Sequence, residues 1–507
     1  MRRIAYRFLA AISLLAAATG AAAAETRPHY GGTLHVMLQS TPESLVLPAS
    51  APPADYWDMA RTLSLIADTL VKLDAQGRPH PALAVAWQSD ASARHWQFTL
   101  RRGVKFHDGS AASPAVVAQI LGALHPGWSV RAAADSVTID INSEAPLPSL
   151  LAELALPRNL LLKRRGNNND NDNDNDKANR VPIGTGPFLV AGWEPGKLLR
   201  LAASEESWAG RPFADAVEIE FGKSLRDQAI AFELNKVDII EASPEAVNGQ
   251  RRSTSSAPSL SFSLPVELLA LVFSANSKAQ DPRLREALAL AIDRKPIQSV
   301  LLKGAGMPAA SILPNWMTGY SAVFSTPANP QRARTLLTDS RQPALNLSYD
   351  PRDPQAQLIA ERIALNAREV GITVQVTLSG AEDIRLMRVV LPSPDPATAL
   401  AEAARQLGLP QASLPPRSNS LDGRSLDGRT LDDLYQSERA LLDGSTVIPL
   451  FHLPLASAAS ARVRGWEADR LGQGNEAGFP LADLWLADPS WTVNSRPYGP
   501  QPEAGSR

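Results

Sequence analysis

The chain has 507 residues, none of them cysteine, and its 50 lysine and arginine residues nearly balance its 52 aspartate and glutamate residues. Because the formal net charge is only −2, neither nucleic acid nor a polyanionic surface is predicted as a partner. The lack of cysteine excludes disulfides and thiol catalysis. At roughly 150 residues per domain the length predicts about three domains, and the hydrophobic fraction of 44% suffices for their cores.

The N-terminus has the three-part form of a cleavable secretory signal. Three arginines within residues 2–7 precede an apolar run over 8–18, and alanines 22–24 stand directly before Glu25. A membrane anchor is the alternative, but the apolar stretch is shorter than the about 20 residues that a spanning helix needs. We therefore expect residues 1–24 to be a signal peptide and the mature protein not to be embedded in a membrane.

Predicted strands and helices follow one another in the first part of the mature chain. Residues 33–38 alternate between polar and apolar side chains, which predicts a half-buried strand. A helix is predicted over residues 56–73, because apolar residues recur there at spacings of three and four. Residues 96–100 alternate again as a strand, and a helix over 114–124 begins with a proline suited to its first position.

The later part of the chain continues in the same way. Asp281 is the predicted N-cap of a helix that starts at Pro282. Another helix, over residues 354–370, stops at Gly371 and leads into an alternating strand over 372–378. This succession of helices and strands predicts a layered α/β fold.

Two segments are predicted to be insertions. Residues 167–179 are almost all asparagine and aspartate, which is too polar to bury, so a disordered surface loop is expected. Residues 420–429 contain the sequence Ser-Leu-Asp-Gly-Arg twice in tandem. This repeat is too short for a repeat architecture and is predicted to be a duplicated loop. Neither segment is expected to carry chemistry.

Motifs for metal or phosphate binding fail on their spacing. Asp170, Asp172 and Asp174 have the alternating spacing of a calcium loop, but asparagine and valine occupy the positions of its glycine and its bidentate glutamate. The sequence Gly-Lys-Ser at 222–224 is similar to the end of a phosphate-binding loop. However, Val217 stands where the first glycine of that loop is required, so a strand-to-helix junction is predicted.

Hydrolase signatures are also absent from the sequence. It contains neither a His-Glu-x-x-His pair nor a Gly-x-Ser-x-Gly elbow. Its seven histidines include no pair spaced by four residues, the spacing that places two metal ligands on one helix face. His107 beside Asp108 leaves a catalytic dyad open, but a hydrogen-bonded turn histidine is the favoured interpretation. We therefore expect no catalytic residues, no bound metal and no cofactor.

Four blocks of sequence match a known pattern. The first contains WQFTLRRGVKFHDGSAASPAVV, over residues 96–117, and the second reads PIGTGPFLVAGWEPGKLLRL, over 182–201. The third block runs over 271–309, and the fourth is VIPLFHLP, over 447–454. In this order they resemble the extracellular solute-binding proteins of family 5, the periplasmic peptide- and nickel-binding proteins of ABC transporters. The resemblance covers nearly the whole mature chain.

The resemblance implies an α/β fold of the periplasmic-binding-protein type, with two lobes around a ligand cleft and a small extra domain. A ligand that contacts both lobes stabilises the closed form, so the cleft binds without breaking bonds. The implied partners are a small-molecule or peptide ligand and the membrane permease subunits of an ABC importer, and the protein is expected to be periplasmic and monomeric. The implied units are the signal peptide at 1–24, lobe I at 25–55, 181–265 and 466–507, the small extra domain at 56–180, and lobe II at 266–465.

The resemblance also implies where the ligand lies. In the peptide-binding members, backbone groups of the protein pair with the peptide backbone as an added strand would, and hydrated pockets take the side chains. For the two aromatic candidates below, core packing and stacking on a ligand are equal alternatives. The candidates come from the loop after the first strand, the first helix and lobe II: Ser40, Thr41, Pro42, Glu43, Tyr56, Trp57, Arg388, Ser393 and Asp395.

One feature of the family pattern is missing. Peptide-binding relatives usually carry Gly-Trp and then an aspartate before an Asp-Pro step, and this aspartate neutralises the ligand ammonium, whereas residues 386–396 here read LMRVVLPSPDP. Without that carboxylate, a free amino terminus would bind more weakly by orders of magnitude. Asp395 is predicted either to contact the ligand or to cap a helix over 397–407. Arg385 and Arg388 are predicted either to favour an anionic ligand group or to be solvated.

The function favoured by the sequence is that of an exported receptor that delivers a peptide-like or other small solute to an ABC importer. The main alternative keeps the same fold but binds a metal chelate or haem, or serves as a sensory or orphan receptor. A secreted hydrolase is much less favoured, because the motifs of that class fail.

Overall fold

The computed structural model describes most of the mature chain. The predicted signal peptide, the Asn/Asp segment at 167–179 and residues 420–427 of the tandem segment lie outside the described residues. The described ranges are 28–47, 53–141, 149–164, 181–243, 259–320, 323–338, 343–378, 382–410, 428–466 and 481–487.

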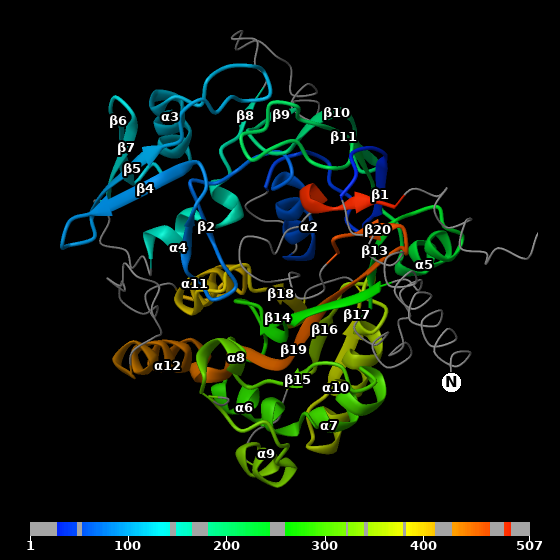
Figure 1. Cartoon of the computed structure of the whole chain (residues 1–507). Coiled ribbons are helices and arrows are strands. Elements are labelled where there is room, and N and C mark those ends of the chain that lie inside the picture. Colours follow the sequence, from blue (N-terminus) through cyan, green and yellow to red (C-terminus); the bar gives the residue numbers. More distant parts are fainter. Residues whose placement is uncertain are drawn as a thin grey trace, which may run out of the picture.

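One mixed sheet of 11 strands runs through the molecule (Figure 1). Its strands lie in the order β10-β11-β12-β1-β13-β19-β14-β18-β16-β17, and β15 pairs with β19 beside this path. Parallel pairs join β1 to β12 and β13, and β16 to β17 and β18, whereas the other pairs are antiparallel. This mixture of pairings, with helices packed on the sheet, confirms the predicted α/β class.

Lobe I is built around the first strand of the sheet. Leu34 and Val36 of β1 are buried with Phe188, Val217 and Ile239 in one hydrophobic cluster. The alternation of buried and half-buried residues along β1 follows the period of two seen in the sequence. The elements of this lobe are β1 (Thr33–Met37), α2 (Pro53–Leu63), β10 (Phe188–Glu194), β11 (Leu198–Ala203), β12 (Ala216–Glu220), α5 (Leu225–Glu233) and β13 (Ile239–Ala242).

The small domain has its own four-stranded antiparallel sheet, β4-β5-β7-β6, and its own core around Phe98, Leu121 and Ile139. Its elements are β2 (Val71–Leu73), β3 (Pro79–Pro81), β4 (Ala84–Ser89), β5 (His95–Leu100), α3 (Pro114–Leu124), β6 (Trp128–Ala132), β7 (Ser136–Ile141), α4 (Leu150–Leu154) and the short helix η2 (Pro157–Asn159). The short strands β8 (Lys163–Arg164) and β9 (Pro182–Ile183) pair with each other where the chain returns to lobe I.

Lobe II lies opposite, in the lower half of Figure 1. Two hydrophobic clusters form its core on the two faces of β14, one around Leu269 and Leu271 and the other around Leu268 and Ala270. Its main elements are β14 (Ser259–Phe273), α6 (Pro282–Ala291), α7 (Arg294–Pro296), η5 (Ile297–Leu301), β15 (Met307–Pro308), α8 (Asn315–Thr318), α9 (Pro330–Leu336), β16 (Leu345–Ser348), α10 (Ala356–Glu369), β17 (Val374–Thr377), β18 (Ile384–Val390), α11 (Pro396–Gln406), α12 (Gly428–Leu442) and η7 (Asp443–Ser445).

Two long strands connect the lobes. β19 (Val447–Ala459) pairs with β14 along its length and with β13 of lobe I at its C-terminal end, from Ala456 to Ala459. The chain then closes lobe I through β20 (Val463–Arg464), η10 (Leu481–Asp483) and β21 (Trp485–Leu486), which contribute to the same cluster as β1. The lobes are therefore joined by continuous sheet.

The hydrophobic clusters bear on where the small domain begins. Met59 and Leu63 of α2 are buried in the cluster of lobe I, and the core of the small domain begins at Leu70. This packing favours placing α2 with lobe I. The boundaries expected from the sequence, including that between 25–55 and 56–180, stay a proposal.

The predicted helix over residues 56–73 is wrong in its second half, because α2 ends at Leu63. Beyond it, Gly186 donates its backbone N–H to the carbonyl of Ile66 at 2.9 Å, and residues 71–73 form β2. Apolar residues at spacings of three and four also occur in the buried turn and the strand that follow α2. Over so few residues, this spacing does not distinguish a turn and a strand from a helix. The helix over 114–124 is confirmed.

Gly184 and Gly186 lie in the second of the four sequence blocks that carry the family resemblance. A Cβ atom on Gly184 would lie 2.1 Å from the carbonyl oxygen of Ile66, and one on Gly186 would lie 2.6 Å from the carbonyl carbon of Ile66. These glycines are therefore required by close backbone approach, which any side chain would prevent.

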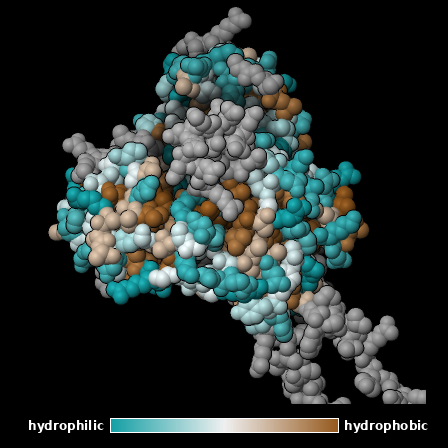
Figure 2. Space-filling view, turned by 90° about the horizontal axis from the view of Figure 1, so that it is seen from above, coloured by the Kyte–Doolittle hydropathy of each residue, from teal (hydrophilic) through white to brown (hydrophobic). Residues whose placement is uncertain are grey.

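The surface seen from above in Figure 2 is mainly hydrophilic, and its hydrophobic residues gather in separate patches. Small, separate apolar patches are normal for a protein surface. Within the described ranges, none of the helices has both the length and the apolar character of a membrane span.

Candidate functional site

A cavity of about 760 Å³ lies between the two lobes. Lobe I contributes Ser40 after β1, residues 55–58 of α2 and Glu241 at the end of β13. Lobe II contributes the loop 348–356 after β16 and residues 385–388 of β18. A solute bound here would contact both lobes, as the closure mechanism requires.

The structure brings together four of the nine predicted ligand residues. Ser40, Tyr56, Trp57 and Arg388 line the cavity. The other five residues, Thr41, Pro42, Glu43, Ser393 and Asp395, are not among its lining residues.

Asp395 instead caps a helix, one of the two roles left open for it. Its carboxylate accepts a hydrogen bond of 2.8 Å from the backbone N–H of Thr398, in the first turn of α11. Asp395 donates its own backbone N–H to the hydroxyl of Ser393 at 3.2 Å. Since these contacts explain both residues, we leave them out of the proposed ligand site.

The hydroxyl oxygen of Ser40 and the indole N–H of Trp57 are among the buried polar atoms at the cavity that have no hydrogen-bond partner in the part of the chain that the structure describes. These two side chains are only 3% and 4% exposed. Burying such a group unsatisfied costs free energy, so native proteins usually provide a partner from protein, water or ligand. Both atoms are therefore suited to receive a ligand.

Arg388 is held between two carboxylates on lobe II. Its guanidinium lies 2.8 Å from Glu267 of β14 and 2.7 Å from Asp353 of the loop after β16. Burial alone would lower the pKa of Arg388, but Glu267 and Asp353 outweigh burial and raise that pKa. The solvated alternative is wrong for Arg388, because the residue is mostly buried and doubly paired.

A similar group lies on lobe I. Arg61 of α2 forms an ion pair with Asp58 and lies 3.6 Å from Glu241. Glu241 also accepts hydrogen bonds from the backbone of Gln39 at 2.7 Å and from the side chain of Gln228 at 3.2 Å. Burial, followed by the neighbouring Asp58, raises the pKa of Glu241 to about 7.

A third arginine joins the two walls of the cleft. Arg352 of lobe II lies 2.7 Å from Asp350 in its own loop and 2.7 Å from Asp55 of α2. The hydrogen bond from Arg352 to Asp350 is the main cause that raises the pKa of Arg352. This arginine therefore stays charged and bridges the lobes.

One edge of β18 faces the cavity without a neighbouring strand. β18 pairs with β14 from Ile384 to Val390, but with β16 only at Ile384 and Arg385. Leu391 donates its backbone N–H to the carbonyl of Val266 at 2.8 Å. In an antiparallel pair only every second residue forms hydrogen bonds with the partner strand, so the peptide groups of Leu386 and Arg388 face away from β14. Among the described strands, none pairs with this edge beyond Arg385.

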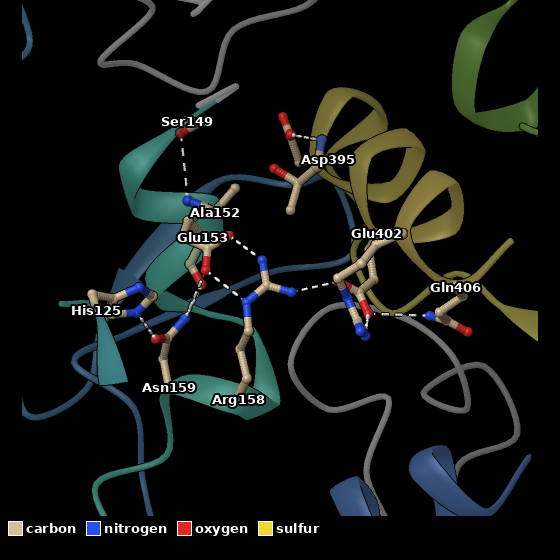
Figure 3. Close-up of polar contacts among 11 residues, drawn as sticks. His125, Ser149, Ala152, Glu153, Arg158, Asn159, Asp395, Glu402 and Gln406 are labelled. Carbon is tan, nitrogen blue, oxygen red and sulfur yellow. Dashed lines mark hydrogen bonds and ion pairs between the residues drawn. The ribbon is translucent and has the colours of Figure 1, made fainter. Parts of the chain in front are cut away.

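A second contact between units joins the small domain to lobe II (Figure 3). Arg158 of η2 forms ion pairs with Glu153 of α4 and with Glu402 of α11, and Glu402 also pairs with Arg405. Asn159 donates hydrogen bonds from its side-chain amide to Glu153, and its side-chain oxygen accepts one from Nε2 of His125. The network ties α11, beside the cleft, to the small domain.

The histidine that was considered for a catalytic dyad has a structural role. The ring of His107 contacts the carbonyl of Gly186 at 3.0 Å, and Asp108 pairs with Lys163 at 2.8 Å. Among the described residues, no group of three or more His, Asp or Glu side chains is arranged to hold a metal ion. The predicted calcium-like aspartates lie outside the described residues.

The sequence did not single out most of the charged cleft residues. Two signals for them were present. Glu267 is a lone charged residue in the apolar run VELLALVF, and Asp350 and Asp353 belong to the loop sequence DPRDP. A charge within a strand core indicates a buried partner, and such a loop at a strand end is a common place for binding residues.

The comparison with known families agrees with this architecture. The profile of the bacterial extracellular solute-binding proteins, family 5, matches residues 78–388, which is more than half of the chain. The chain belongs to this family. The family resemblance stated above is confirmed, and the protein is a solute-binding receptor.

The similar proteins of known name are distant. The probable di/tripeptide-binding protein 5 of Pseudomonas aeruginosa is 23% identical over 393 residues, which cover 69% of this chain and 73% of the relative. The nickel-binding periplasmic protein of Escherichia coli is 24% identical over 352 residues, which cover 63% of this chain and 66% of the relative.

Solved structures share the fold at still lower identity. The oligopeptide-binding protein AppA of Bacillus subtilis, in complex with a nonapeptide, gives a TM-score of 0.73 at 16% identity, covering 91% of this chain and 100% of AppA. NikA of Staphylococcus aureus, in complex with Ni(L-His)2, gives a TM-score of 0.70 at 18% identity, covering 90% of this chain and 98% of NikA. These likenesses confirm the two-lobed fold. The proteins in these comparisons are binding proteins.

Proposed function

We propose that this protein is the exported receptor of an ABC importer, which captures a peptide-like solute between its lobes and delivers it to separate membrane permease subunits. Export to the periplasm, removal of residues 1–24 and a monomeric state are parts of this proposal. Support comes from family membership and from relatives named as di/tripeptide-binding proteins. Catalysis is not part of the proposed function.

The main observation in favour of a peptide-like ligand is the open edge of β18. The peptide groups of Leu386 and Arg388 face away from β14, and both residues line the cavity. An extended peptide pairs with such an edge through main-chain hydrogen bonds, which are independent of the peptide's sequence. The edge therefore fits a ligand with its own amide groups.

The binding free energy of such a solute is used for closure. Because the lining residues come from both lobes, a bound solute stabilises the closed arrangement more than the open one. A micromolar affinity corresponds to about −8 kcal/mol, which suffices to shift an open-to-closed equilibrium.

The metal-chelate or haem alternative is less favoured. Relatives named as nickel- and heme-binding proteins occur in the same family. However, no histidine is among the described residues that line the cavity. A metal chelate has no peptide backbone that could pair with the open edge of β18, so the peptide-like solute remains the proposal.

Native mass spectrometry of the protein isolated from its own periplasm tests the proposal. We expect a monomer that starts at Glu25 and carries a noncovalent mass, and fragmentation of that mass should show amide-linked residues. A tripeptide methylated at one backbone nitrogen should bind at least tenfold more weakly than its unmethylated form, because it loses a strand hydrogen bond. A co-purified metal chelate, or equal binding of both tripeptides, would contradict the peptide assignment.

A further inference from the structure

The cleft wall carries more carboxylates than cations. Seven aspartate and glutamate side chains line the cavity, against five arginines and no lysine, for a net charge of −2. Three of the arginines are each shared by two carboxylates: Arg61 by Asp58 and Glu241, Arg352 by Asp350 and Asp55, and Arg388 by Glu267 and Asp353.

The two remaining arginines are also occupied. Arg385 forms an ion pair with Glu382, and Arg405 forms one with Glu402 and lies 5.7 Å from the ring of Tyr56. An anionic ligand group would have to displace a carboxylate that already holds the guanidinium. The arrangement therefore disfavours the anionic ligand that Arg385 and Arg388 seemed to offer in the sequence.

A cationic ligand group meets the opposite situation. Each shared arginine leaves one carboxylate charge in excess, in a space partly removed from water, where charges interact more strongly. The pKa of Glu241 is raised first by burial and then by this excess of negative charge, since the charge of Asp58 is the second largest cause. A cation placed among these side chains would neutralise the excess, as a proton on Glu241 does.

Other features of the wall point to a ligand independently of charge. The Ser40 hydroxyl and the Trp57 indole N–H line the cavity, are more than nine-tenths buried and have no hydrogen-bond partner among the described residues. Tyr56 and Tyr349 also line the cavity. Aromatic faces favour ammonium and guanidinium groups through their quadrupole.

From this arrangement we infer that the solute carries a net positive charge, and that its ammonium or guanidinium group is bound by the carboxylates shared with Arg61 and Arg388. This inference rests on the proposed receptor function and narrows it to basic peptides. Glu241 of lobe I and Asp353 of lobe II are the specificity-determining residues. Because they belong to opposite walls, the same cation would draw the lobes together.

Calorimetric titration with matched tripeptides tests the charge requirement. Ala-Lys-Ala, Ala-Gln-Ala and Ala-Glu-Ala differ by one charge each and share the same backbone. We expect Ala-Lys-Ala to bind at least tenfold more tightly than Ala-Gln-Ala, and Ala-Glu-Ala to bind most weakly. The advantage of Ala-Lys-Ala should shrink as salt is raised from about 50 to 500 mM, because salt screens the attraction.

Two variants locate the effect. Asp353→Asn and Glu241→Gln should each weaken Ala-Lys-Ala at least fivefold more than they weaken Ala-Gln-Ala. Glu286→Gln is the matched control, because Glu286 pairs with Arg332 at 2.7 Å and does not line the cavity. Thermal unfolding shows whether each variant is folded. If Asp353→Asn does not fold, Glu241→Gln alone still tests the inference.

The possible failures are distinguishable. If Ala-Gln-Ala or Ala-Glu-Ala binds as tightly as Ala-Lys-Ala, or if neither a tripeptide nor spermidine binds, the charge inference is overturned. The receptor function is judged separately, by the mass that co-purifies with the protein. A neutral or anionic peptide in that measurement supports the receptor and overturns the charge inference. Binding of spermidine without any tripeptide supports the cation requirement and overturns the peptide ligand.

Discussion

The guanidinium of Arg352 on lobe II lies 2.7 Å from the carboxylate of Asp55 on α2, so an ion pair crosses the cleft. A second ion pair, between Arg158 and Glu402, crosses from the small domain to the same lobe. Separation of lobe II from the rest of the molecule would break both contacts. These pairs therefore stabilise the closed arrangement, in addition to any bound solute.

Asp55→Asn should shift the free protein towards an open form. The pair is partly exposed, so its loss should cost about 0.5 kcal/mol, or roughly a twofold change in the open-to-closed ratio. Because the chain has no cysteine, Leu234→Cys and Val300→Cys on the exposed surfaces of the two lobes accept spin labels specifically. Electron-spin distance measurements should show a larger population at the longer distance.

The control for that experiment is Asp135→Asn in the small domain, which removes an equally charged but exposed side chain, 3.7 Å from Arg102. It should leave the distance distribution unchanged. An identical distribution for Asp55→Asn and the unmodified protein would show that the Arg352 pair does not hold the lobes together.

Glu402→Gln should lower the stability of the folded protein. The Glu402 carboxylate is 1% exposed and pairs with both Arg158 and Arg405, which are 34% and 40% exposed. Since both guanidinium groups keep contact with water, the cost should be about 1–2 kcal/mol rather than that of a fully buried pair. Thermal unfolding measures it, and Glu206→Gln, which breaks an exposed pair with Lys105, should change the midpoint little.

Glu438→Gln should remove part of the pH dependence of stability. Burial raises the pKa of Glu438 to about 7, although Tyr320 and the backbone N–H groups of Leu313 and Ile312 bind its carboxylate. A folded pKa above the unfolded value gives stability that is complete below about pH 4.5 and is lost as pH rises through 7. The variant should lack this loss.

The measurement is the free energy of unfolding of both proteins between pH 4.5 and 8. The difference between the two free energies of unfolding removes the contributions of other titrating groups. One of these is His452, because burial lowers the pKa of His452 to about 4. The unmodified protein should lose up to about 1.4 kcal/mol per pH unit relative to Glu438→Gln between the unfolded and the folded pKa of Glu438, and the loss should level off above about pH 7. A constant difference across this range would contradict the prediction.

Gly184→Ala should destabilise the protein by about 3 kcal/mol or more, because the new methyl group would lie 2.1 Å from the Ile66 carbonyl oxygen. Gly122→Ala is the matched control. Gly122 lies within α3 and has no neighbouring atom within 4 Å of an added Cβ, so alanine should stabilise that helix by about 0.5–1 kcal/mol. Thermal unfolding that shows equal midpoints for the two variants would refute the close-approach argument.

Local elements were predictable where the signal is local. The alternation of residues 33–38, the helix over 114–124 and the caps at Asp281 and Asp395 are present as expected. Each depends on a few neighbouring residues, whose periodicity and hydrogen bonds are contained within one element. The helix over 56–73 was predicted too long, because its end depends on a glycine segment more than 100 residues away.

The sequence by itself determined the α/β class, the positions of several elements and, through four blocks of sequence, the family. Only the tertiary structure decided which charges face the solute. Arg388 meets Glu267 across 121 residues of sequence, and Arg352 meets Asp55 across 297. Pairing at such separations follows from sheet order and lobe closure, which no local pattern encodes, so the structure shows arginines already neutralised where the sequence offered an anion site.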